Sequence, residues 1–123
     1  MDAKFIHGTP WMVDYTPSTD VSGGDVVEVG DLPLVAHRDI DADIDEKGAL
    51  AAGGGVYEMT AGEAIAAGKQ VYWNATTERV YDADKTGSGT SGEPVFGYVE
   101  PDSSATAAGD TIRVMHMPIK NPG

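Results

Sequence analysis

The sequence predicts a single, mainly β domain: a small antiparallel barrel or a jelly-roll-like sandwich with one short helix. The chain has 123 residues, the length of one domain. Short runs of β-branched and aromatic residues alternate with turns that use many of its 16 glycines. Because only 7% of the residues are aromatic, the core must be thin, and association with copies or a partner would add stability.

The chain begins with an expected N-terminal arm at residues 1–20, followed by a β-rich domain at 21–117 and a tail at 118–123. Within the arm, a short strand is predicted at Lys4–His7. Termini are usually loose unless they are tied down. The aromatic rings of the arm therefore either pack on the domain's own core or dock on a neighbouring molecule. These rings are Phe5, Trp11 and Tyr15.

Two strands are predicted next, at Val26–Val29 and Leu32–Ala36. Pro33 cannot donate a ladder hydrogen bond, so the second strand either lies at a sheet edge or begins near this proline. A further strand at Val56–Met59 is followed by the one predicted helix, in the segment Thr60–Gly68. There a threonine precedes a glutamate by three residues, the spacing of a capping box, and the final glycine suits a helix C-terminus.

The clearest signal in the chain is a β-hairpin at Gly68–Asp82. Its β-branched and aromatic residues flank a short polar turn at Asn74–Glu78. Because strand side chains alternate between faces, we predict Val71 and Trp73 in the core and Tyr72 on the opposite face.

The last two strands are predicted at Val95–Val99 and Ile112–Met117. Both faces of the second strand are largely apolar, which indicates a central or an interfacial position. His116 lies on one of these faces. It is interpreted as a strand residue with satisfied hydrogen bonds, and a ligand or a pH switch is the alternative.

The net charge of −12 comes from 20 acidic and 8 basic residues. Nucleic-acid binding and attachment to anionic membranes both require basic surfaces, so neither is expected. The charge favours solubility and attraction to a positively charged partner. The sequence has no cysteine, no basic-then-apolar signal segment at its start and no apolar run of about 20 residues. The protein is therefore expected to act in solution, most simply in a cytoplasm.

No catalytic, cofactor or metal site is predicted, and the protein is not expected to be an enzyme. The alternating acids of Asp39–Glu46 lack the glycine and the closing glutamate of an EF-hand loop. We interpret them as solvated acids, with a weak divalent-cation site as the alternative. The glycine-rich segment Thr86–Gly92 is followed by Glu93-Pro94 rather than by the Lys-Ser/Thr of a phosphate-binding loop. The three histidines lie in unrelated elements without zinc-site spacing.

The order and spacing of five segments resemble those of small capsid decoration (cement) proteins of tailed phages. The segments are Gly24–Leu32, His37–Asp39, Glu63–Val80, Pro94–Val99 and Gly109–Met117. The resemblance implies a structural virion protein, made in the cytoplasm of a bacterial host, that binds the outer surface of the phage head. It implies that the protein stabilises the assembled capsid by bridging major capsid protein subunits, and that it self-associates as a trimer or as a dimer.

Aromatic and methionine side chains are frequent anchors of protein interfaces. The expected capsid or subunit contacts are therefore Phe5, Trp11, Tyr15, Met115 and Met117. Two other functions stay open. A tail-associated or carbohydrate-binding β-module would use Trp11, Tyr72 or Trp73 as a stacking platform. A calcium-stabilised surface module would use the acids of Asp39–Asp45.

Overall fold

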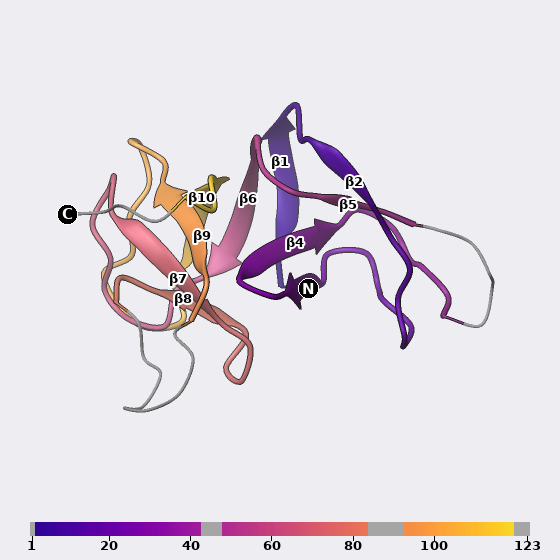
Figure 1. The fold of residues 1–123 in the computed structure, drawn as a ribbon. Coiled ribbons are helices and arrows are strands. Elements are labelled where there is room, and N and C mark those ends of the chain that lie inside the picture. Colours follow the sequence, from indigo (N-terminus) through magenta and orange to yellow (C-terminus); the bar gives the residue numbers. More distant parts are fainter. Residues whose placement is uncertain (1, 43–47, 84–92, 120–123) are drawn as a thin grey trace.

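The structure is a computed structural model and describes residues 2–42, 48–83 and 93–119. These ranges contain ten strands and no helix. The strands form two antiparallel sheets, which lie towards the two sides of Figure 1, with β1 and β6 near the middle. The predicted mainly β, antiparallel architecture is confirmed.

The larger sheet has six strands in the order β1-β6-β10-β9-β7-β8. β1 and β8 stand at the two ends of this order, and β10 lies inside the sheet, as the apolar character of both its faces predicted. The strands are β1 (Lys4–Gly8), β6 (Gly55–Thr60), β7 (Gln70–Asn74), β8 (Arg79–Tyr81), β9 (Val95–Val99) and β10 (Thr111–His116).

The smaller sheet has four strands in the order β2-β5-β4-β3. They are β2 (Met12–Tyr15), β3 (Val26–Val29), β4 (Leu32–Ala36) and β5 (Gly48–Ala51). Pro33 is the second residue of β4. That strand is internal, and β5 pairs with it only at Val35 and Ala36. The proline therefore marks the start of a strand rather than a sheet edge.

Two chain segments pass from one sheet to the other at a shared corner, one between β1 and β2 and one between β5 and β6. Backbone hydrogen bonds join them, from Trp11 N–H to the Gly53 carbonyl at 2.8 Å and from Ala52 N–H to the Trp11 carbonyl at 2.7 Å. Gly54 has φ +94°, and a Cβ there would approach the Thr9 carbonyl oxygen to 2.8 Å. Only glycine fits at this point of the corner.

Two clusters of buried side chains form the core. The larger one includes Trp73, which is 1% exposed, and Val71, which is fully buried. The smaller one is centred on Leu50 and lies under the four-stranded sheet. Tyr72, between the two core residues of β7, is half-buried. The predicted inward direction of Val71 and Trp73 is confirmed.

The helix predicted at Thr60–Gly68 is wrong. Ala61 forms a parallel bridge with Val80, and Ile65 forms an antiparallel bridge with Ala105. Ala61 is fully buried and Ile65 is 1% exposed. The Ala61 N–H donates to the Asp110 carbonyl and the Ile65 N–H to the Ala105 carbonyl, so neither group is available for a local helical hydrogen bond. Tertiary pairing overrides the local capping signal.

Candidate interaction surface

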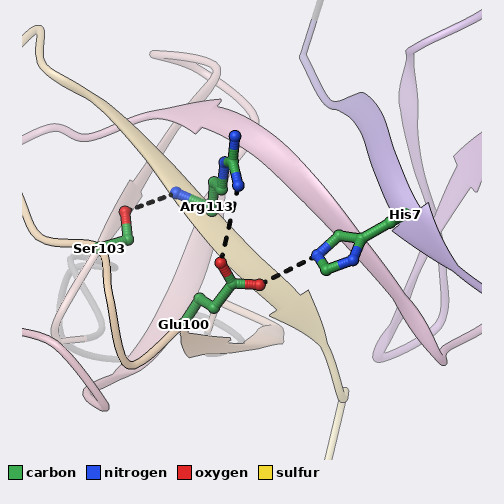
Figure 2. A network of polar contacts seen from close by, with 4 residues as sticks. All are labelled: His7, Glu100, Ser103 and Arg113. Carbon is green, nitrogen blue, oxygen red and sulfur yellow. Dashed lines mark hydrogen bonds and ion pairs between the residues drawn. The ribbon is translucent and has the colours of Figure 1, made fainter.

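The outer face of the six-stranded sheet carries a polar network centred on Glu100 (Figure 2). The Nε2 atom of His7, on β1, lies 3.1 Å from one Glu100 carboxylate oxygen. Arg113, on β10, lies 4.0 Å from the other oxygen, and its backbone N–H donates to the Ser103 hydroxyl. The network ties the edge strand β1 to the middle of the sheet. Its exposed ion pair contributes little stability, about 1 kcal/mol or less.

An apolar patch lies at the corner between the sheets. We define the corner patch as Trp11, Met117, Pro118 and Ile119. Trp11 is 71% exposed, Met117 43% and Ile119 68%. The Trp11 and Pro118 rings both approach Gly53, because a Cβ placed there would meet them at 3.5 and 3.6 Å. Both rings therefore lie close to the same glycine.

A groove of about 530 Å³ lies where the start of β1 meets the end of β4. The ring of Phe5 forms part of its wall, 4.9 Å from the ring of His37 and 5.6 Å from the ring of Tyr57 between centroids. The His37 Nε2 and Tyr57 Oη atoms are 2.6 Å apart and share a hydrogen bond. Burial lowers the pKa of His37 and raises the pKa of Tyr57, so both groups are uncharged at neutral pH.

Two cations also line this groove, Lys4 and Arg38. Both are exposed, and neither forms an ion pair within the part of the chain that the structure describes. Asp39 lines the groove too, but its carboxylate accepts the Gly23 N–H at 2.8 Å. The groove therefore combines an apolar wall with unpaired positive charge in a strongly acidic protein.

His116 connects the two sheets from inside the core. Its Nε2–H donates to the Pro33 carbonyl oxygen at 2.8 Å, which links β10 to β4. The ring stacks on Phe96 with 4.4 Å between centroids. Burial lowers the pKa of His116 to about 4, so the ring is neutral at pH 7. The interpretation as a hydrogen-bonded strand residue is confirmed for Nε2, whereas Nδ1 has no partner among the described residues.

The five predicted contact residues fall in different places. Trp11 and Met117 are both exposed, and Met117 directly precedes Pro118, whose ring approaches Gly53 as the Trp11 ring does, whereas Phe5 lines the groove. Tyr15 is half-buried against the smaller core cluster, so its ring folds back on the protein itself. Met115 is half-buried on β10. Trp73 is buried, so it cannot be the exposed stacking platform of a carbohydrate-binding module.

Several surface residues were missed from the sequence: Lys4, His37 and Arg38 in the groove, and Ile119 in the corner patch. One signal was available, since Lys4-Phe5 and His37-Arg38 each place a cation beside a ring. That the two pairs share a groove depends on the pairing of β1 with β6, which brings Phe5 opposite Tyr57.

No three metal-ligand side chains are grouped together among residues 2–42, 48–83 and 93–119. The acidic segment proposed as a cation site extends into residues 43–46, and the glycine-rich segment 86–92 also lies outside the described residues. No helix in the described ranges is both long and apolar enough to cross a membrane.

The described residues form two antiparallel β-sheets with a groove between them and exposed apolar side chains at their corner. The family model for phage cement proteins matches residues 6–116. The chain belongs to the phage cement protein family, as the order of its segments predicted, and is therefore a structural, capsid-associated component of a phage virion. Neither a curated protein nor a solved structure matches the sequence.

Proposed function

We propose that this protein binds the outer surface of the assembled phage head and stabilises it by bridging neighbouring major capsid subunits. Membership of the cement family supports the capsid as the target. The observation that carries the proposal is the corner patch, where a tryptophan is 71% exposed on a hydrogen-bonded backbone. Tryptophan is among the residues that most often dominate binding energy at interfaces.

The acidic charge supports the same target. A net charge of −12 attracts the protein to positively charged surfaces and raises the rate of encounter. We therefore propose a capsid surface with complementary basic residues around an apolar site that receives Trp11. Binding should weaken as salt rises, because exposed charges are screened over about 10 Å at 0.1 M salt.

A binding assay tests the proposal, in which purified protein is mixed with expanded, undecorated heads of the phage to which it belongs. Saturable binding and a higher head melting temperature are expected. Trp11→Ala should weaken binding by about tenfold or more, the effect of losing one anchor. Tyr72→Ala serves as the aromatic control and should leave head binding unchanged. Tyr72 is half-buried on β7, four strands away from β1 in the larger sheet.

Heads that bind neither protein nor variant would overturn the function. Equal binding by the native protein and Trp11→Ala would instead move the contact away from the corner patch.

We also propose self-association, as a trimer or as a dimer, because a thin core gains stability from partners.

A further inference from the structure

The molecule presents a second exposed apolar feature, the tip of the β3–β4 hairpin. We define the hairpin tip as Val29, Gly30, Asp31 and Leu32. Val29 is 44% exposed and Leu32 is 36% exposed, and the two are register partners. Gly30 has φ +60° and Asp31 does not have positive φ, which fits a type II′ turn. The tip is thus a tight two-residue turn that presents an acidic side chain between two exposed aliphatic ones.

The tip and the groove are complementary in both character and charge. The groove offers the Phe5 ring as an apolar wall and Lys4 and Arg38 as cations without ion pairs. The Asp31 carboxylate likewise has no hydrogen bond or ion pair within the described residues. The groove volume of about 530 Å³ falls within the range of about 300–1,000 Å³ typical of binding pockets. It can accommodate a few side chains.

We propose that the groove between the two sheets receives the hairpin tip of a second copy of this chain. The inference rests on the proposed self-association and does not depend on head binding. A molecule cannot fill its own groove, because the groove residues Gly24 and Ala36 flank the base of the same hairpin. The tip lies at the other end of β3, roughly 15–20 Å away at about 3.3 Å per residue.

The contact joins two different surfaces, so it is heterologous and each molecule offers one tip and one groove. Closure of such contacts gives a ring, which is consistent with a trimer. Charge specifies the pairing, because the two unpaired cations of the groove outnumber its one acid, Asp39, and attract the Asp31 carboxylate, whereas most of the surface of a protein with net charge −12 would repel it.

Charge exchange tests the contact without heads. The variants are Asp31→Lys, the double variant Lys4→Glu with Arg38→Glu, and the triple variant that carries all three changes. All three residues are exposed, and circular dichroism checks that each variant keeps the fold. Sedimentation equilibrium then measures self-association of each protein over a range of concentrations.

The native protein should associate, and the tip variant and the groove variant should each lose about tenfold or more in association constant. The triple variant should recover most of that loss, because its positive tip again faces a negative groove. Self-association that is unchanged in the tip and groove variants would overturn the assignment while leaving self-association intact. A native protein that stays monomeric would overturn both, and head binding would still be judged by its own assay.

Loss of association in the tip and groove variants without recovery in the triple variant would also contradict the pairing, since each surface would then have another partner. Leu32→Ser provides an uncharged check. It should weaken association in the native background and in the triple variant alike, because the apolar contact is common to both.

Discussion

Acidification should destabilise this fold through His116. The pKa of its ring is about 4 in the folded protein, against 6.5 for an unperturbed histidine. As the pH falls from about 6.5 to about 4, the unfolded chain therefore binds a proton that the folded chain does not bind, and the free energy of unfolding decreases. Each pKa unit corresponds to about 1.36 kcal/mol, so the full difference amounts to about 3 kcal/mol. That is a large part of the roughly 5–15 kcal/mol that holds a domain together.

Urea unfolding followed by fluorescence of the buried Trp73 measures this change at a series of pH values. The comparison is His116→Gln, whose amide can still donate towards Pro33 but does not titrate. The variant should be less stable at neutral pH. As the pH falls from about 6.5 to about 4, its free energy of unfolding should decrease by up to about 3 kcal/mol less than that of the native protein. Burial raises the pKa of Asp2 and Glu28. These two groups increase the free energy of unfolding as the pH falls, and they do so equally in both proteins.

Identical pH dependence in the two proteins would refute this reasoning. If the glutamine variant does not fold, an NMR titration of the His116 ring in the native protein decides the same question. A ring that gains its proton near pH 6.5 rather than near 4 would show that burial does not exclude the charge.

Three further substitutions test packing and surface assignments. Gly97→Ala should destabilise by about 3 kcal/mol or more, because its Cβ would overlap the Met115 carbonyl oxygen of β10. Gly30→Ala is the control, with free space around the Cβ and a cost of about 1–2 kcal/mol from its positive φ; similar unfolding midpoints for the two would disprove the overlap. Leu50→Ala, at a fully buried position, should cost about 2–5 kcal/mol in urea unfolding. Trp11→Ala should change stability by no more than about 0.5 kcal/mol, and a larger loss would mean that the ring supports the fold itself.

Several strand positions in this chain follow from local patterns. The runs Val26–Val29, Leu32–Ala36 and Val95–Val99 were predicted with the bounds that the structure has. Each is a short, largely apolar run that directly follows an acidic residue or a proline. Where side chains alternate strictly, as at Val71, Tyr72 and Trp73, the direction of each side chain could be predicted too.

Features decided by distant residues could not be predicted in this way. The spacing from Thr60 to Gly68 favours a helix locally, but Val80 and Ala105 pair with that segment and fix it as irregular, buried chain. The groove has the same origin, since the rings of Phe5 and His37 are 32 positions apart in the sequence and 4.9 Å apart in the fold. Aromatic residues in the arm gave no sign that Tyr15 would turn inward and Trp11 outward.

The corner gives the two proposed surfaces their separate roles. The Trp11 side chain is exposed, but its backbone is hydrogen-bonded to Ala52 and Gly53. Little backbone entropy is therefore lost when its ring binds. Phe5 lies near the other end of β1, roughly 15–20 Å away along the chain. Under the two proposals, the corner patch would contact a capsid while the groove holds a second copy. The linked copies would then bind neighbouring capsid sites together, so the second attachment would be intramolecular and the assembly would bind far more tightly than one copy.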